Sequence, residues 1–136
     1  MLIEISHLND AQVDDLLQMY QVEWWTRGRK REDVQEMLKH SDQVVAFCDS
    51  ETGQLVAFAR ILTDYVYRGL IFDVIVNLSY RGQGVGRKLM ESILDRPELA
   101  KVGNFGLFGI LVLGNNINYQ CDRQPNRILG AIAIAA

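Results

Sequence analysis

The glycine-rich segment YRGQGVGRKL at residues 80–89 constrains the fold of this chain more than any other feature. It follows the apolar run LIFDVIVN (70–77) and leads into VGRKLMESIL (85–94), where apolar residues recur at helical spacing. The pattern predicts a strand, a short loop and a helix. Unpaired amide groups in the first turn of a helix, together with the helix dipole, form a site for an anion. Glycines let the backbone approach that anion closely.

Two familiar phosphate-binding loops do not fit this segment. A Walker loop of a nucleotide hydrolase needs Gly-Lys followed by Ser or Thr, whereas Gly86 is followed by RKL. A dinucleotide fingerprint that starts at Gly82 or Gly84 needs a later glycine where arginine or leucine stands. The segment is therefore an Arg-x-x-Gly-x-Gly loop that opens a helix. Positive charge at its rim comes from Arg81, Arg87 and Lys88.

The first half of the chain predicts a strand and two helices. LIEIS (2–6) alternates as a strand does, and Asn9 with Gln12 forms a capping-box start for a helix. The apolar face of that helix is predicted to include Val13, Leu16, Leu17, Tyr20 and Trp24. A second helix at about 31–40 is expected to bury Val34, Met37 and Leu38.

The second half predicts more strands. An antiparallel hairpin is expected from VVAFCD (44–49) and LVAFARILTD (55–64), and the next strand is expected at 70–77. After the helix at 85–94, NFGLFGILV (104–112) is expected to form a further strand. The expected fold is an α/β (α+β) domain with a mixed, mostly antiparallel central sheet flanked by helices. At 136 residues, with no internal linker or repeat, the chain is expected to be a single domain, 1–136.

Composition excludes several function classes. The net charge is −3, so the chain as a whole does not attract nucleic acid. The longest apolar stretch, 105–114, is too short for a membrane helix. Two cysteines without a secretory signal predict reduced thiols and a cytoplasmic location. His7 and His40 are isolated, so no metal site is expected.

The segment IFDVIVNLSYRGQGVGRKLMESIL resembles the acetyl-coenzyme A signature of the GNAT acetyltransferase superfamily. The Asp-x-x-Val strand, the Tyr80-Arg81 pair and the helix after the loop occupy their expected places, and the element order fits over about residues 1–107. The resemblance implies acetyl-coenzyme A as co-substrate, with its pyrophosphate on the loop. The implied binding residues are Arg81, Gly82, Gln83, Gly84, Val85, Gly86, Arg87 and Lys88.

The same resemblance implies a bulged strand before the loop that separates from the strand beside it. The backbone of Val74, Ile75 and Val76 would bind the pantetheine arm there, and the Val74 N–H would polarise the thioester carbonyl. Because buried strands are ordinarily apolar, these three side chains are equally expected of a simple core strand.

Among the side chains, Asp73 is the main candidate for a catalytic or acceptor-binding role. A carboxylate within IFDVIV is costly to bury without a partner. Beside an acyl-transfer centre it could accept a proton from an ammonium or orient the acceptor. The alternative is a partly exposed strand residue paired to Arg60 or Arg68.

The stretch WWTRGRK (24–30) lies where the family places a loop over the acceptor. Trp25 could wall an acceptor pocket, Arg27 or Arg29 could hold a substrate anion, and Tyr65 could line the same side. The alternative is that one tryptophan, Trp24, completes the helix core while the arginines are solvated. A small-molecule amine is a better expected acceptor than a protein lysine, because no peptide groove is indicated.

Residues 104–136 depart from the family pattern. They hold 3 of the 31 charged residues and lack the Tyr-x-x-x-Gly-Phe segment that would supply a tyrosine general acid. One hypothesis is an altered reading frame near 105–110, which sequencing the DNA would test. The other is real divergence, with 115–127 forming a different cap. Loss of the usual segment would expose a sheet edge and favour a homodimer.

The sequence therefore predicts an acetyl-coenzyme A-dependent N-acetyltransferase that acts by direct attack of an amine on the thioester. The alternative is a non-catalytic acyl-coenzyme A-binding module or an inactive homologue. A nucleotide hydrolase is excluded, because the loop lacks the Lys-Ser/Thr pair that such an enzyme requires.

Overall fold

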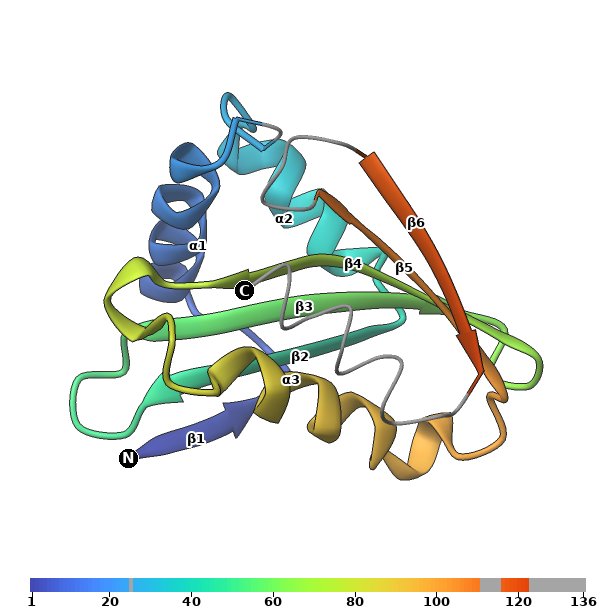
Figure 1. Ribbon diagram of the computed structural model, residues 1–136. Helices are drawn as coiled ribbons and strands as arrows, with labels where there is room; N and C mark the ends of the chain where they lie inside the picture. Colours follow the sequence, from blue (N-terminus) through green and yellow to red (C-terminus); the bar gives the residue numbers. More distant parts are fainter. Residues whose placement is uncertain (25, 111–115, 123–136) are drawn as a thin grey trace.

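The computed structural model describes the backbone of residues 1–24, 26–110 and 116–122, and side chains as far as residue 107. These residues include six strands and three α-helices (Figure 1). Two short 3₁₀ helices, Leu78–Tyr80 and Pro97–Leu99, flank the third α-helix. In chain order the main elements are β1 (Leu2–Ile5), α1 (Asp10–Val22), α2 (Arg31–Lys39), β2 (Gln43–Asp49), β3 (Leu55–Thr63), β4 (Arg68–Val76), α3 (Val85–Leu94), β5 (Asn104–Ile110) and β6 (Asn116–Asp122).

The strands form one sheet in the order β1-β2-β3-β4-β5-β6. Every neighbouring pair is antiparallel except β4 and β5, which are parallel. The parallel step needs a crossover, and α3 supplies it between these two strands. The predicted fold, a mixed and mostly antiparallel sheet flanked by helices, is confirmed.

The helices divide between the two faces of the sheet (Figure 1). On one face, Leu16 and Tyr20 of α1 and Val34 of α2 pack on the sheet around Phe58. The opposite face buries a larger core against α3, with Phe47, Ile71, Leu89, Met90 and Phe105 among its residues. Strand residues alternate between these cores, as the period of two requires.

The prediction that Trp24 completes the core face of the first helix is wrong. The helix ends at Val22, Trp24 lies beyond it, and 62% of its surface is exposed. Thr26 is buried instead. Its hydroxyl donates to the carbonyl of Tyr20 at 2.8 Å, which satisfies a carbonyl group in the last turn of α1. Helical spacing could not show where this helix stops.

The strand predicted at 104–112 is observed over Asn104–Ile110, and β6 pairs antiparallel with its outer edge. Since β6 follows β5 in the sheet, the edge of β5 is covered over the paired residues. Part of the cap expected at 115–127 is therefore a strand. Residues 123–136 lie outside the described residues.

Candidate active site

A β-bulge in β4 shapes the centre of the site. Opposite β3, Phe72 pairs with Arg60 and Ile75 with Phe58, so β4 has one residue more than β3 between these pairs. Asp73 lies in the bulge with a φ of 55°. Asp and Asn adopt this left-handed conformation more readily than most residues do. The extra residue brings Asp73 to the sheet face that α1 and α2 cover.

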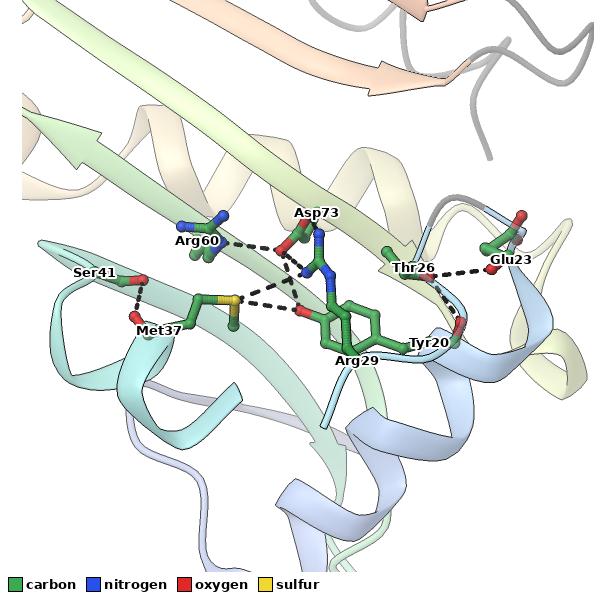
Figure 2. Close-up of polar contacts among 8 residues, drawn as sticks. All are labelled: Tyr20, Glu23, Thr26, Arg29, Met37, Ser41, Arg60 and Asp73. Atoms are coloured by element: carbon green, nitrogen blue, oxygen red, sulfur yellow. Dashed lines mark hydrogen bonds and ion pairs between the residues drawn. The ribbon is translucent and has the colours of Figure 1, made fainter. Parts of the chain in front are cut away.

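There Asp73 is the centre of a buried polar cluster, defined as Tyr20, Arg29, Arg60 and Asp73 (Figure 2). Its Oδ2 accepts hydrogen bonds from Arg29 Nη1 at 2.7 Å, Arg60 Nε at 2.9 Å and the Tyr20 hydroxyl at 3.1 Å. Its Oδ1 accepts from Arg29 Nη2 at 3.3 Å. Only 4% of Asp73 is exposed. Four donor contacts offset the cost of burying its charge.

The cluster determines the protonation of its members. Burial raises the pKa of Asp73, but hydrogen bonds and charge from Arg29 and Arg60 outweigh it and hold the pKa below its usual value. Burial, followed by the charge of Asp73, raises the pKa of Tyr20 well above its usual value. Tyr20 is therefore neutral and Asp73 ionised at neutral pH. An ionised carboxylate with two guanidinium partners is a weak proton acceptor.

Each arginine of the cluster also lies against an aromatic ring. The guanidinium carbon of Arg29 is 4.7 Å from the ring centroid of Tyr20, and that of Arg60 is 4.9 Å from the ring of Phe72. Such contacts hold a guanidinium plane in a defined orientation. Arg60 comes from β3, Phe72 and Asp73 from β4, and Arg29 from the loop between α1 and α2.

The glycine loop leads directly into the N-terminus of α3. Gly82 and Gly84 have φ values of 76° and 78°, and Gly84 is the N-cap of α3. Among the described residues, no protein acceptor is recorded for the backbone N–H groups of residues 82–87. The last three of these groups belong to the first turn of α3, where the helix provides no acceptor. The loop thus presents amide donors at the positive end of a helix.

Each basic side chain of this loop contacts at least one other group of the protein. Arg81 donates from Nε to the carbonyl of Val76 at 3.0 Å and from Nη2 to Glu23 at 2.8 Å. Arg87 pairs with Glu91 at 3.0 Å on the surface of α3. The Lys88 ammonium lies 5.2 Å from the ring centroid of Phe47. No acceptor among the described residues is recorded for the Nη groups of Arg87 or the ammonium of Lys88, so the loop has uncommitted cationic donors as well as backbone amides.

Within the described residues, β4 and β5 are paired over only part of their length. Their parallel ladder begins with Arg68 beside Asn104 and ends with Phe72 beside Phe108, although β4 continues to Val76. In Figure 1 the two strands diverge beyond this point. Val74, Ile75 and Val76 thus follow the last pair, and they lie between the bulge and the glycine loop.

Several predicted acceptor residues are not brought to the cluster. Arg27 is exposed and donates to the carbonyl of Gln21. Tyr65 lies in the turn between β3 and β4, where its hydroxyl donates to the carbonyl of Asp42. Trp25 lies outside the described residues. Of the four predicted residues, Arg29 alone contacts Asp73 in the described structure.

Sequence reasoning did not assign Tyr20 and Glu23 to the site, and it named Arg60 only as an alternative partner of Asp73. Of the two alternative partners, Arg60 contacts Asp73, whereas Arg68 donates to Asn104 at 3.0 Å. The sequence signal for this pair was that Arg60 and Asp73 are charged residues within the apolar runs of two adjacent strands. Tyr20 matched the helical core pattern, which conceals the role of its hydroxyl.

Other kinds of site find no support in the described part of the chain. No group of three or more His, Cys, Asp or Glu side chains is placed to hold a metal ion there. In the same residues, no helix has both the length and the apolar character needed to cross a membrane.

Comparison with known proteins identifies the family. The model of the Acetyltransferase (GNAT) family matches residues 11–104. GCN5-related N-acetyltransferase 1, chloroplastic, of Arabidopsis thaliana is 29% identical over 104 residues, covering 74% of this chain and 52% of the relative. Serotonin N-acetyltransferase 2, chloroplastic, of Oryza sativa subsp. japonica is 34% identical over 82 residues, covering 59% of this chain and 41% of the relative.

A solved structure shows the same fold. A GNAT family acetyltransferase of Streptococcus pneumoniae TIGR4 superposes with a TM-score of 0.61 at 24% identity, covering 80% of this chain and 76% of that one. The chain spans about half the length, or less, of the two curated relatives. The predicted resemblance is confirmed by the family match, which includes the bulged strand and the glycine loop. The chain belongs to the GNAT acetyltransferase family.

Proposed function

We propose that this chain is an N-acetyltransferase that binds acetyl-coenzyme A and transfers the acetyl group to a primary amine of a small molecule. One observation carries the proposal. The β4–β5 ladder ends at Phe72, next to the bulge at Asp73, on the same strand that leads into uncommitted amides of the glycine loop. A single strand thus leads from the last described β4–β5 pair to an anion site, the order that an extended thioester with a pyrophosphate requires.

The loop residues fit such a ligand. Amides of residues 82–87 are donors for a pyrophosphate at the N-terminus of α3. A Cβ built on Gly82 or Gly84 meets no atom within 4 Å, so the space in front of these residues is open. Arg81 donates hydrogen bonds to the carbonyl of Val76 and to Glu23, and these contacts stabilise the turn before the loop. Bound acetyl-coenzyme A supplies an activated acetyl thioester.

The end of β4 would position the acetyl group. In our proposal the backbone of Val74, Ile75 and Val76 binds the arm of the ligand, and the Val74 N–H donates to the thioester carbonyl as negative charge develops there. The ladder to β5 ends at Phe72, before these three residues. The amine would approach from the face covered by α1 and α2, where the loop carrying Arg29 reaches the strand.

Two roles were predicted for Asp73, proton transfer and orientation of the acceptor. The contacts support orientation, because both carboxylate oxygens accept from cations and the pKa is lowered. In this role Asp73 is a positioning residue that holds Arg29 and Arg60. One relative is named as a serotonin N-acetyltransferase, and serotonin is a primary amine, which supports an acceptor of this kind.

Two measurements test the proposal. Calorimetry with coenzyme A and acetyl-coenzyme A is expected to show binding; absence of binding at submillimolar concentration would refute both the enzyme and the acyl-coenzyme A-binding alternative. Release of free thiol in the presence of an amine panel then separates the two. Turnover with at least one amine supports the enzyme, and binding without turnover supports the non-catalytic module.

A further inference from the structure

We propose that the acceptor carries a carboxylate close to its amine, and that the free edge of Arg60 binds it. This inference rests on the proposed function and names the substrate class of the same site. It is carried by the contacts of Arg60, by the charge of the cluster and by the position of the cluster on β4.

Arg60 uses only one edge of its guanidinium. Nε donates to Asp73 at 2.9 Å and the plane lies against the ring of Phe72. No acceptor within the described structure is recorded for its two Nη groups. They are not among the buried side-chain atoms without a partner, although the Arg60 side chain is only 17% exposed. These donors therefore reach solvent, and Figure 2 shows the edge of Arg60 that binds Asp73.

The cluster carries an excess of positive charge. One carboxylate, Asp73, faces two guanidiniums, and Tyr20 is neutral because burial and the charge of Asp73 raise its pKa. The carboxylate of Glu23 is committed to Arg81. A half-buried site with one uncompensated positive charge disfavours an acceptor that carries only an ammonium group. It favours an acceptor whose own carboxylate balances the charge.

The shape of the free edge also favours a carboxylate. Two Nη groups form a planar fork that matches two carboxylate oxygens. The aromatic ring and Asp73 fix the plane, so little rotational freedom is lost when the ligand binds.

Arg60 also lies close to the proposed site of acetyl transfer. Arg60 pairs with Phe72 in the sheet, at the point where the β4–β5 ladder ends and next to the bulge. A carboxylate at Arg60 would therefore lie near the proposed site of acetyl transfer at Val74. We therefore expect an acceptor whose amine and carboxylate are close together, separated by one or two carbons as in an α- or β-amino acid.

The experiment compares acceptors that differ only in the carboxylate. Thiol release is measured with 5-hydroxytryptophan and serotonin, and with alanine, glutamate and β-alanine against their amides. We expect kcat/KM to favour the acid over its partner by about tenfold or more in the best pair, the effect of a charge-assisted hydrogen bond. Equal or better turnover of the partners that lack the carboxylate would overturn the proposal.

Variants assign the preference to Arg60. In Arg60→Gln the acid-to-amide ratio should fall close to one. In Arg60→Lys, which keeps the charge but loses the fork, it should be intermediate. Arg31→Gln removes the same charge from a surface arginine paired to Asp10 and Asp14 and should leave the ratio unchanged. Persistence of the wild-type preference in both Arg60 variants would overturn the assignment.

A binding measurement separates this inference from the proposed function. Calorimetry compares N-acetylalanine with N-acetylalaninamide in the presence of coenzyme A. Tighter binding of the acid in wild type, lost in Arg60→Gln, supports the anion site even if no amine is acetylated. Coenzyme A binding and turnover of amides, without any preference for acids, would support the acetyltransferase and refute the carboxylate site.

Discussion

Gly84 shows how one residue couples backbone conformation to the proposed cofactor site. Its φ of 78° allows the chain to turn from the 3₁₀ segment into α3 and to direct successive amides outward. An L-residue pays a steric cost in this conformation that glycine does not. Because space for a Cβ is available, the cost of a substitution comes from the backbone alone.

Gly84→Ala is therefore predicted to weaken binding of coenzyme A. The strain of about 1 kcal/mol at a positive φ is relieved by a shift of the loop, which misaligns the amides. Gly53→Ala is the matched control, since Gly53 has a φ of 75° and open space in the turn after β2. Calorimetry should show loss of affinity in the first variant only, while unfolding shows a similar stability cost in both. Equal coenzyme A affinity in the two variants would contradict the prediction.

Among the elements, the contact between Glu23 and Arg81 joins the two halves of the proposed site. Glu23 is the C-cap of α1 and begins the loop that carries Arg29 to Asp73. Arg81 is the first residue of the glycine loop signature, and the two side chains meet at 2.8 Å. The acceptor loop and the cofactor loop are thus tied by one half-buried ion pair.

Glu23→Gln is predicted to tighten binding of coenzyme A. Loss of the carboxylate leaves the charge of Arg81 uncompensated beside the proposed pyrophosphate site. A partly exposed pair is worth up to about 1 kcal/mol, which corresponds to an increase of about two- to fivefold in affinity. Calorimetry at low salt measures the change, and Glu36→Gln, an exposed carboxylate of α2, is the control. An unchanged or weaker affinity would refute this role of Glu23.

At the scale of the whole molecule, the sheet separates the proposed chemistry into two sides. α3 and a large apolar core occupy one face, and the polar cluster lies beneath α1 and α2 on the other. The bulge in β4 and the end of the β4–β5 ladder are the places where the two sides meet. This arrangement lets a cofactor and an acceptor approach one strand from different directions.

Acid should destabilise the whole fold. The pKa of Asp73 is lowered by its arginine partners, and those of Asp49 and Asp64 are lowered by backbone N–H donors. A carboxyl group with a lower pKa in the folded state stabilises the protein above its unfolded pKa of 3.8. That contribution is lost as the pH falls through the folded pKa values. Unfolding free energy should therefore be level between about pH 7 and 5 and decline below about pH 4.

Asp73→Asn is the variant that tests this prediction. Removing the anion leaves two partly buried cations facing each other, so stability at pH 7 should fall by about 2–4 kcal/mol. The variant should also lose less further stability between pH 5 and pH 3, because the titrating group is gone. Urea unfolding at each pH measures both effects, with Asp33→Asn on the surface of α2 as control. An acid loss equal to that of wild type would show that Asp73 does not contribute.

Local patterns were sufficient for the framework of the site. Alternation and helical spacing predicted the strands and helices from β1 to β5 in order but not β6, and the glycines with the preceding strand predicted the loop that the family match includes. These features depend on neighbours in sequence, so the sequence alone could show them. The end of α1 was missed because Thr26 caps it from beyond the periodic stretch.

The sequence by itself therefore determined the family, the order of the elements from β1 to β5 and the place of the glycine loop before a helix, since each follows from residues close together in the chain. Only the tertiary structure decided which charges meet. Arg29, Arg60 and Asp73 come from three separate segments, the loop after α1 and the strands β3 and β4. Glu23, at the start of that same loop, meets Arg81 from the segment before α3. The register of β3 on β4 and the bulge at Asp73 place these groups within hydrogen-bonding distance. No local pattern specifies how residues far apart in the chain pair in a sheet. That pairing places the carboxylate of Asp73 among its arginine partners at the centre of the site.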